Sequence, residues 1–373
     1  MPVYCKREGK NLLFFCDILT FGVVFCVQVL QLIPLYCKIK KKQKGELVVK
    51  KVILDCDPGH DDAFAIMLAC AHLDVLGITT VGGNGYLPNV TRNALQILDV
   101  IGRSDIPVYP GHSGPCTAEL VIADNVHGKS GMEGPVLPEP SRSAGTMHGV
   151  DFIVKTIMEQ EDVTIIATGP LTNIASALNK EPAIAKRIKE ISIMGGGAYC
   201  GNWTPAAEFN IFVDPEAAYK VFHSGVPLKM SGVNLTRQCH ITPENREQLR
   251  ALNTKAGIFA AELLDFFGHG DAAHLHDACA AAWVIDESLV ESAYLHVDIE
   301  LNGKLTRGMT VCDLRTLQTE HPMVDFDLQS GKHWDDAPVG SPFRGEEPNC
   351  HVGMRFNIEK FRTLLYDTIK SYK

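Results

Sequence analysis

From Glu46 onward the chain alternates short β-branched runs with helical patterns, and this alternation restricts the fold more than any other feature. The β-branched runs are "LVVKKVILD", "VLGITTV", "VTIIATG", "ISIMGGG" and "PLKMSGV". A stretch of helical pattern follows each run, as at residues 61–72 after the first one. Such alternation indicates βαβ units and a parallel sheet. We therefore predict a single α/β domain with an open, mainly parallel, Rossmann-like sheet flanked by helices.

Three later segments complete this expectation. In "VDIELNGKLTRGMTVCDL", Asn302-Gly303 stands between two alternating runs and predicts an antiparallel hairpin. A helix is expected from about Ile358 to Tyr372. Residues 111–145 and 316–350 are rich in glycine and proline and predict long loops, which often border the active site of an α/β enzyme.

The first 45 residues differ from the rest of the chain. They contain an almost continuous apolar stretch, Leu12–Tyr36, and the basic "CKIKKKQKG" after it. A signal anchor has this pattern, although Asp17 and Pro34 interrupt the stretch and no small-residue cleavage site follows. We predict an N-terminal extension (1–45), either a membrane tether through residues 12–36 or a segment of no functional consequence, ahead of a catalytic domain (46–373).

Charge excludes one class of partner. The formal net charge is −9, and the first 44 residues hold eight Lys/Arg and two acidic residues, so the remainder carries −15. Nucleic-acid binding needs a basic surface. We therefore expect no nucleic-acid partner.

Cysteines and glycosylation motifs bear on location. The twelve cysteines form no C-x-x-C pair, and several lie in apolar runs, so we expect reduced, mostly buried thiols. N-x-[ST] motifs begin at Asn89, Asn202 and Asn234, where a lumenal chain would risk glycosylation. The basic stretch Lys38–Lys44 also favours the cytosolic side of any tether. These features predict a cytoplasmic catalytic domain.

Four aspartates, Asp55, Asp57, Asp61 and Asp62, fall within eight positions of "ILDCDPGHDDA" at the end of the first strand. Two carboxylates about 4 Å apart repel by about 4 kcal/mol at an effective dielectric of about 20, so such a group needs a cation or shared protons. Apolar runs on both sides place the aspartates at the edge of a core rather than on a solvated face.

Other strands also end in polar residues, as a ligand site beyond the carboxyl edge of a sheet requires. These residues are Asn84, Thr168, Asn173, Asn202, Glu208, Asn210, His276 and Asp277. Hard oxygen donors of this kind select Ca²⁺ or Mg²⁺, and several carboxylates in a flexible site favour Ca²⁺. Zinc is disfavoured because no H-E-x-x-H or Cys/His spacing occurs.

Several blocks match the inosine-uridine-preferring nucleoside hydrolases in order and spacing. They are "ILDCDPGHDDAFA", "TTVGGN", "DNVHGKSG", "TGPLTNIA", "MGGG", "AEFNIFVDPEAA" and "LHDACA". The chain resembles this family from about Lys50 to Val311 and in the terminal helix, with residues 1–45 and an apparent insertion at 316–350 as departures. The resemblance implies Ca²⁺-dependent cleavage of a ribonucleoside into free base and ribose.

The resemblance also implies roles for individual residues. The metal ligands would be Asp57, Asp62, the Thr168 carbonyl and Asp277, with Asp57 also the general base. His276 would be the acid that protonates the departing base. The residues expected to bind the substrate are Asp61, Asn84, His127, Met194, Asn202, Glu208, Phe209 and Asn210. Asp55 is expected to brace the loop by accepting backbone N–H bonds. The partner would be a small nucleoside, and we expect a homo-oligomer, either a dimer or a tetramer.

The residues leave two alternatives and one question open. A phosphohydrolase of the haloacid-dehalogenase type also ends its first strand in D-x-D, but it normally lacks the Pro-Gly-x-Asp-Asp continuation. A catalytically silent nucleoside-binding protein would show a broken base or metal ligand, and none is broken here. Base preference is less constrained. Phe209 in the "AEFN" block and the scarcity of tryptophan favour broad use of inosine and uridine.

Overall fold

The computed structural model describes residues 5–7, 10–12, 49–315, 317 and 346–372. The chain divides into two compact units, Met1–Val49 and Lys50–Lys373. In the first unit, β1 (Cys5–Arg7) pairs antiparallel with β2 (Lys10–Leu12). Residues 13–36 of the predicted tether lie outside the described residues, as does most of segment 316–350. Among the helices that are described, none is long and apolar enough to cross a membrane.

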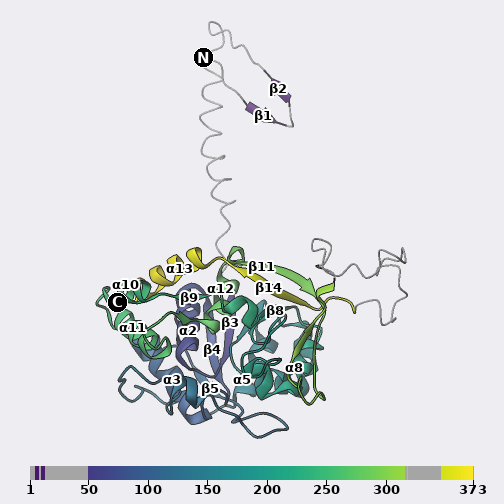
Figure 1. Cartoon of the computed structure of the whole chain (residues 1–373), viewed down its shortest axis with the longest axis horizontal. Coiled ribbons are helices and arrows are strands. Elements are labelled where there is room, and N and C mark those ends of the chain that lie inside the picture. The colour runs from purple at the N-terminus through teal and green to yellow at the C-terminus, as the bar shows by residue number, and fades with distance from the viewer. Residues whose placement is uncertain (1–4, 8–9, 13–48, 316, 318–345, 373) are drawn as a thin grey trace. The chain divides into compact units, whose positions relative to one another are not determined.

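An eight-stranded sheet runs through the second unit (Figure 1). Its order is β11-β14-β8-β7-β6-β3-β4-β5, and every neighbouring pair is parallel except β11 and β14 at one edge. The strands are β3 (Lys51–Cys56), β4 (Asp74–Thr80), β5 (Val108–Pro110), β6 (Val163–Ala167), β7 (Glu190–Met194), β8 (Leu228–Ser231), β11 (Val290–Leu295) and β14 (Cys350–Phe356). The predicted mainly parallel α/β sheet is confirmed.

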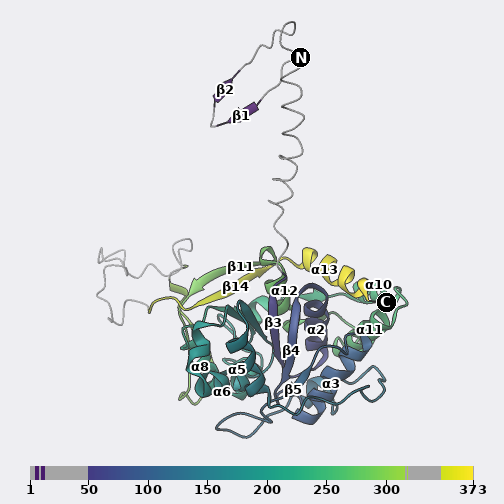
Figure 2. The same ribbon diagram turned by 180° about the vertical axis from the view of Figure 1, so that it is seen from behind.

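Helices cover both faces of the sheet, and strand β3 shows why. Val52, Leu54 and Cys56 pack into one hydrophobic core, whereas Ile53 packs into the other, as the two-residue period of a strand requires. The first core is closed by α2 (His60–His72), α3 (Leu87–Val100), α11 (Lys255–Phe267), α12 (His276–Ile285) and α13 (Ile358–Ser371). The second is closed by α5 (Gly149–Glu159), α6 (Thr172–Lys180) and α8 (Pro215–Phe222). Figures 1 and 2 show α3 and α11 on one side of the strands and α5 and α8 on the other.

Short elements fill the connections. They are α4 (Asp124–His127), η1 (Pro182–Lys186), α7 (Phe209–Val213), α9 (Val233–Thr236), β9 (His240–Ile241), α10 (Pro243–Arg250), β10 (Ala273–His274) and η2 (Glu287–Leu289). The predicted long loop 111–145 is irregular apart from α4. The predicted terminal helix is α13, and it ends at Ser371.

The predicted hairpin forms, but its turn differs from the expected one. β12 (Val297–Ile299) pairs antiparallel with β13 (Thr310–Cys312), and ten residues connect them rather than the Asn302-Gly303 pair. The Glu300 side chain accepts the backbone N–H groups of Asn302 and Gly303 at 2.6 and 2.9 Å, which folds this pair into a wider loop. The strands are therefore joined through a side-chain-stabilised loop instead of a two-residue turn.

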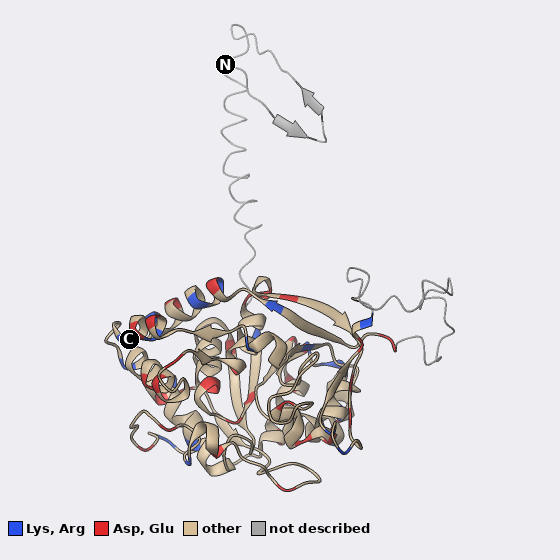
Figure 3. Cartoon of the chain, viewed as in Figure 1, with Lys and Arg blue, Asp and Glu red and all other residues tan. Residues whose placement is uncertain are grey.

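Charge and thiols agree with the sequence. Figure 3 shows Lys and Arg positions scattered among Asp and Glu over the described part of the second unit, rather than gathered into one basic stripe. The eight cysteines from Cys56 to Cys350 are all free, and five of them are buried, namely Cys56, Cys70, Cys239, Cys279 and Cys350.

Candidate functional site

The turn from β3 into α2 gathers three carboxylates. Asp57 follows the strand, and Asp61 and Asp62 lie in the first turn of the helix, where the helix dipole favours negative charge. Asp62 Oδ2 accepts the backbone N–H of Gly59 at 2.9 Å and the Asn84 amide at 3.1 Å. Its Oδ1 accepts the hydroxyl of Thr168 at 2.7 Å. Asp62 is thereby fixed by groups from three different strand ends.

Asp57 is completely buried, and half of its carboxylate is unpaired. Oδ2 accepts the backbone N–H of Asn84 at 2.7 Å, whereas Oδ1 has no hydrogen-bond partner in the described part of the chain. The loops that enclose it must lack side chains, because a Cβ on Gly83 would lie 2.1 Å from Oδ2 and one on Gly169 2.7 Å from Oδ1. Burial, with repulsion from Asp62, raises the pKa of Asp57 well above its ordinary value.

Asp277, at the start of α12, completes the cluster. One carboxylate oxygen each from Asp61, Asp62 and Asp277 lies within 4.8 Å of the others, and all three residues are buried. Burial, then repulsion from Asp61 and Asp62, raises the pKa of Asp277 well above its ordinary value. Burial and Asp62 raise the pKa of Asp61 to about 7. Buried carboxylates that repel one another, one with an unpaired oxygen, suit a hard cation.

The grouping differs in part from the predicted ligand set. The three-carboxylate group contains Asp61, which was expected on the ribose, and does not contain Asp57, which was expected as a ligand. The carbonyl of Thr168 accepts the side-chain amide of Asn210 at 2.8 Å, and a carbonyl retains a second lone pair. All the donors are oxygens, so the residues present fit a Ca²⁺- or Mg²⁺-type ion.

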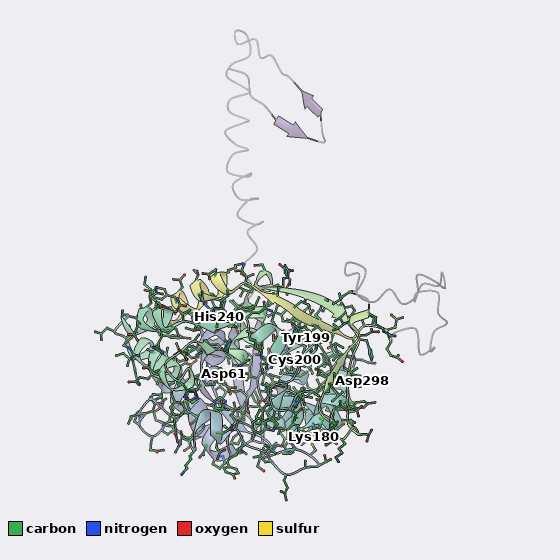
Figure 4. All side chains as sticks on the ribbon, in the orientation of Figure 1. Asp61, Lys180, Tyr199, Cys200, His240 and Asp298 are labelled. Carbon is green, nitrogen blue, oxygen red and sulfur yellow. The ribbon has the colours of Figure 1, made fainter. Side chains whose placement is uncertain are left out.

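A cavity of about 270 Å³ opens above these carboxylates. Its volume is close to the lower end of small-molecule sites, about 300 Å³. It is lined by Asp61, Asn84, Ala123, Val126, His127, Thr168, Met194, Asn202, Trp203, Glu208, Phe209, Asn210, Phe267, His276 and Asp277. Eleven of the thirteen predicted site residues are on this wall, and Asp57 and Asp62 lie outside the lining. Figure 4 shows Asp61 in the middle of the domain.

Four lining residues were not predicted: Ala123, Val126, Trp203 and Phe267. Ala123 and Val126 adjoin His127 in the first long loop, and Trp203 follows Asn202, so proximity to predicted residues could have identified them. Phe267 ends a helix whose apolar pattern is the same as that of a core helix. Nothing in its sequence context distinguishes Phe267 from a residue of the hydrophobic core.

One side of the cavity carries hydrogen-bonding groups from the start of α7. Glu208 caps this helix by accepting the backbone N–H groups of Asn210 and Ile211 at 3.0 and 3.2 Å. Burial raises the pKa of Glu208 to about 7, although these bonds oppose the shift. The Asn210 amide donates to the carbonyls of Thr168 and Met194 at 2.8 and 3.1 Å. Both side chains are therefore fixed before any ligand binds.

Aromatic rings also line the cavity. Trp203 meets Phe209 edge to face, with ring centroids 4.9 Å apart. Asn202 accepts the backbone N–H of Phe209 at 3.0 Å, which ties the Asn202 loop to α7. Phe267 and His127 stack across the cavity wall at 5.5 Å. Flat rings of this kind suit a planar base.

Two histidines face the cavity. His276 begins α12, and its Nδ1 lies 2.7 Å from the hydroxyl of Thr236. Burial, then His274 and Arg237, lowers the pKa of His276 to about 4. Burial, then His60 and His276, lowers the pKa of His127 to about 3. Neutral rings therefore predominate at both positions at neutral pH.

His127 is held by a residue that the sequence analysis did not single out. Its Nδ1 lies 3.1 Å from Nδ1 of His60, whose Nε2 lies 2.7 Å from the carbonyl of Glu133. His60 is also stacked on Phe266 and Phe267. His60, which stands between Gly59 and Asp61, thus connects the turn from β3 into α2 to the loop that carries His127.

Asp55 braces the site differently from expectation. Its Oδ1 accepts the hydroxyl of Thr79 at 2.5 Å and the amide of Asn173 at 2.8 Å, and no backbone N–H of a described residue donates to it. Asp55 points between β4 and α6 and is not part of the cavity lining. The expected loop-bracing bonds are wrong because the alternation of β3 turns this side chain away from the loop.

Together, the parallel sheet and the cavity above buried carboxylates at its carboxyl edge define an α/β protein with a site that fits a metal ion and a small polar ligand. Comparison with known proteins narrows this class. The family model "inosine-uridine preferring nucleoside hydrolase" matches residues 52–363. The chain belongs to that family, a family of metal-dependent hydrolases, and it is a nucleoside hydrolase.

Relatives and solved structures agree. Over 293 residues the chain is 48% identical to the pyrimidine-specific ribonucleoside hydrolase RihA of Citrobacter koseri, covering 74% of this chain and 94% of the relative. RihA of Escherichia coli K12 is 47% identical, and the match again covers 74% of this chain and 94% of the relative. The structure of a purine-preferring ribonucleoside hydrolase from Gardnerella vaginalis has a TM-score of 0.75 at 31% identity, covering 87% of this chain and 99% of that one. A plant nucleoside hydrolase, PpNRh1, has a TM-score of 0.74 at 33% identity, with 86% and 99% covered.

Because the chain belongs to this family, it is not a phosphohydrolase of the haloacid-dehalogenase type. Family membership also disfavours the catalytically silent nucleoside-binding protein, because the family and the relatives matched are nucleoside hydrolases.

Proposed function

We propose that this chain is a Ca²⁺-dependent ribonucleoside hydrolase of nucleoside catabolism and salvage that prefers pyrimidine nucleosides. The observation that supports the chemistry most strongly is Asp57, a buried carboxylate next to the Asp61–Asp62–Asp277 group, with one oxygen that has no partner in the described ranges of the chain. Such an arrangement suits a site that binds a cation and accepts a proton.

The residues that would hold the ion are Asp57, Asp62, the carbonyl of Thr168 and Asp277. Asp61, whose oxygen lies within 4.8 Å of those of Asp62 and Asp277, would either join them or bind the ribose. A bound Ca²⁺ supplies positive charge that offsets the carboxylates and acidifies a water molecule. The absence of nitrogen and sulfur donors from this set supports Ca²⁺ over zinc.

Asp57 would act as the general base. Water attacks C1′ of the ribose while Asp57 accepts one of its protons, and the electrons of the N-glycosidic bond leave with the base. Asp61, Asn84, Asn202, Glu208 and Asn210 would bind the ribose hydroxyls. Their fixed carboxylates and amide oxygens would stabilise the positive charge that develops on the sugar ring.

His276 would donate a proton from Nε2 to the departing base. Its lowered pKa makes the protonated ring a stronger acid, but keeps that form a minor population at neutral pH. His127, Met194 and Phe209 would contact the base together with Trp203 and Phe267, which also line the cavity.

Two observations support the proposed base preference, namely the identity to named relatives and the volume of the cavity. Relatives named pyrimidine-specific are 47–48% identical, whereas the structure named purine-preferring is 31% identical. A cavity of about 270 Å³ also suits the smaller base. We therefore place uridine and cytidine ahead of inosine, a narrower preference than the inosine and uridine use expected from sequence. Initial rates on uridine, cytidine, inosine, guanosine and adenosine test this order, and a faster rate on inosine than on both pyrimidine nucleosides would reverse it.

We also propose that the catalytic domain faces the cytosol, whether free or tethered through residues 12–36. Asn234 supports this, because its side chain is buried and both ends are used. Oδ1 accepts the N–H of Ala198 and Nδ2 donates to the carbonyl of Gly353, each at 2.9 Å. A glycan there is incompatible with the fold. Protease protection on intact cells tests the proposal, which fails if the domain is digested from outside or carries N-glycans.

The predicted homo-oligomer stays a proposal. Light scattering on the eluted peak of the full chain distinguishes a dimer or tetramer from a monomer, and a monomeric mass would remove the prediction.

A further inference from the structure

Thr236 is a fully buried residue at the end of α9, five residues beyond the last residue of β8 and outside the cavity lining. Its hydroxyl lies 2.7 Å from Nδ1 of His276. In the described part of the chain this is the only hydrogen bond of the Thr236 side chain, and also the only one of the His276 ring. The contact joins residues 40 positions apart. It is therefore a tertiary contact rather than a local helix cap.

The single contact determines which ring nitrogen the substrate meets. With Nδ1 engaged by Thr236, Nε2 is the nitrogen left for the cavity that His276 lines. The two ring nitrogens of histidine are distinct, and the bond made by one sets the orientation and role of the other. Without that bond, rotation about the Cβ–Cγ bond could exchange the two edges of the ring.

The type of residue also fits this task. A hydroxyl hydrogen rotates freely, so it can donate to a bare Nδ1 or turn away and let the oxygen accept from Nδ1–H. In the protonated ring, and in the neutral ring that remains after Nε2 gives up its proton, Nδ1–H donates to the threonine oxygen, so the contact is kept through the step. If Thr236 had only a structural role, its hydroxyl would not need to bond to the ring of His276.

We propose that Thr236 is a positioning residue for hydrolysis, which holds His276 by Nδ1 so that Nε2 is directed at the departing base. This inference rests on the proposed function of His276. In the step that it supports, the Nε2–H bond of the protonated ring breaks and the base takes that proton together with the electrons of the N-glycosidic bond. The ring is left neutral, with Nδ1–H donating to the Thr236 oxygen.

Two matched pairs of variants isolate the hydroxyl. Thr236→Val is nearly isosteric with threonine, and Thr236→Ala differs from Thr236→Ser only by the oxygen. Each variant is assayed as the full chain with Ca²⁺ on uridine and on p-nitrophenyl riboside, whose leaving group needs no acid. The melting temperature of each variant is measured in parallel.

We expect Thr236→Val and Thr236→Ala to lower kcat on uridine by about 10- to 100-fold, the range for partners that orient a functional histidine. Rates on the nitrophenyl riboside should stay within about threefold, and Thr236→Ser should retain most of the rate on uridine. In a His276→Ala background, Thr236→Val should cost nothing further on uridine, because its effect passes through the ring.

Equal losses on both substrates, an unchanged rate on uridine, or a full additional loss in the His276→Ala background would overturn the proposal. If Thr236→Val does not fold, the Ala and Ser pair gives the same comparison. Failure of the proposed function is distinct, because the unmodified chain would then hydrolyse neither substrate.

Discussion

The backbone N–H of Asn84 donates to Oδ2 of Asp57 at 2.7 Å, and Oδ1 of the same carboxylate is buried without a hydrogen-bond partner among the residues that the structure describes. The first bond fixes the orientation of the side chain. The second oxygen keeps its full capacity to accept a hydrogen bond, a proton or a cation. The loop at the carboxyl end of β4 therefore orients the carboxylate that follows β3.

Replacing the Asp57 carboxylate by an amide of the same shape should remove activity. We expect Asp57→Asn to lower kcat on uridine by at least about 10²- to 10⁴-fold, the usual contribution of a positioned base. Loss of a metal ligand would add to the effect. Steady-state kinetics check this, with circular dichroism to confirm folding. A folded variant with near-normal turnover would remove Asp57 from the mechanism.

Metal dependence should appear in stability as well as in rate. After exhaustive chelation we expect no hydrolysis, and we expect Ca²⁺ to restore it. Because an ion binds only the folded site, Ca²⁺ at 100 times its dissociation constant should stabilise the chelated protein by about 2.7 kcal/mol. Thermal unfolding with and without Ca²⁺ measures this. Full activity in metal-free protein, or a melting temperature that Ca²⁺ does not raise, would argue against the ion.

His276 and Asn210 should differ in their dependence on the leaving group. Substituting His276 by alanine should slow uridine far more than p-nitrophenyl riboside, because an activated leaving group departs without a proton. Substituting Asn210 by alanine should slow both substrates alike, because its amide acts at the ribose end. Equal losses on the two substrates in the His276 variant would exclude it as the acid.

Asp55 should make the stability of the metal-free protein pH-dependent. Burial, partly offset by bonds from Asn173 and Thr79, raises its pKa from 3.8 to about 6. Between these values the folded state binds more proton than the unfolded state, so the free energy of unfolding falls as pH rises from about 4 to 6. The Asp55→Asn variant lacks this titrating carboxyl and therefore its pH-dependent contribution to the free energy of unfolding. Its stability relative to the unmodified chain should therefore rise by about 1–3 kcal/mol across that window. Urea unfolding at several pH values tests this, and parallel pH profiles would contradict it.

Local patterns predicted the sheet and the polar strand-end residues of the cavity wall, whereas His127, Met194 and Phe209 were expected only from the family resemblance. Strand and helix periods are local, and parallel strands bring their carboxyl ends to one edge of the sheet. Asp57, Asn84 and Asp277 could therefore be expected together although they are far apart in the chain. The partners of Asp55 could not be predicted, since they depend on which face of β3 each side chain occupies.

Phe267, His60 and Thr236 show a second limit. Phe267 ends an apolar helix pattern, and only the packing of α11 beside the loop of His127 brings it to the cavity. His60 is recognised by its contacts with His127 and Glu133, at 3.1 and 2.7 Å, and Thr236 by one contact with His276, at 2.7 Å. Such contacts follow from the angle between packed elements, which the sequence pattern does not contain. The hairpin turn was mispredicted for a related reason, because the Glu300 side chain competes for the backbone N–H groups of the turn.

Product analysis of uridine incubated with the purified full chain and Ca²⁺ tests the central claim most directly. We predict that uracil and ribose appear in equal amounts as uridine disappears, without added phosphate, and that the matched Asp57→Asn protein yields neither. Uridine that is bound but recovered intact would contradict the account, as would product formation that survives in the Asp57→Asn protein.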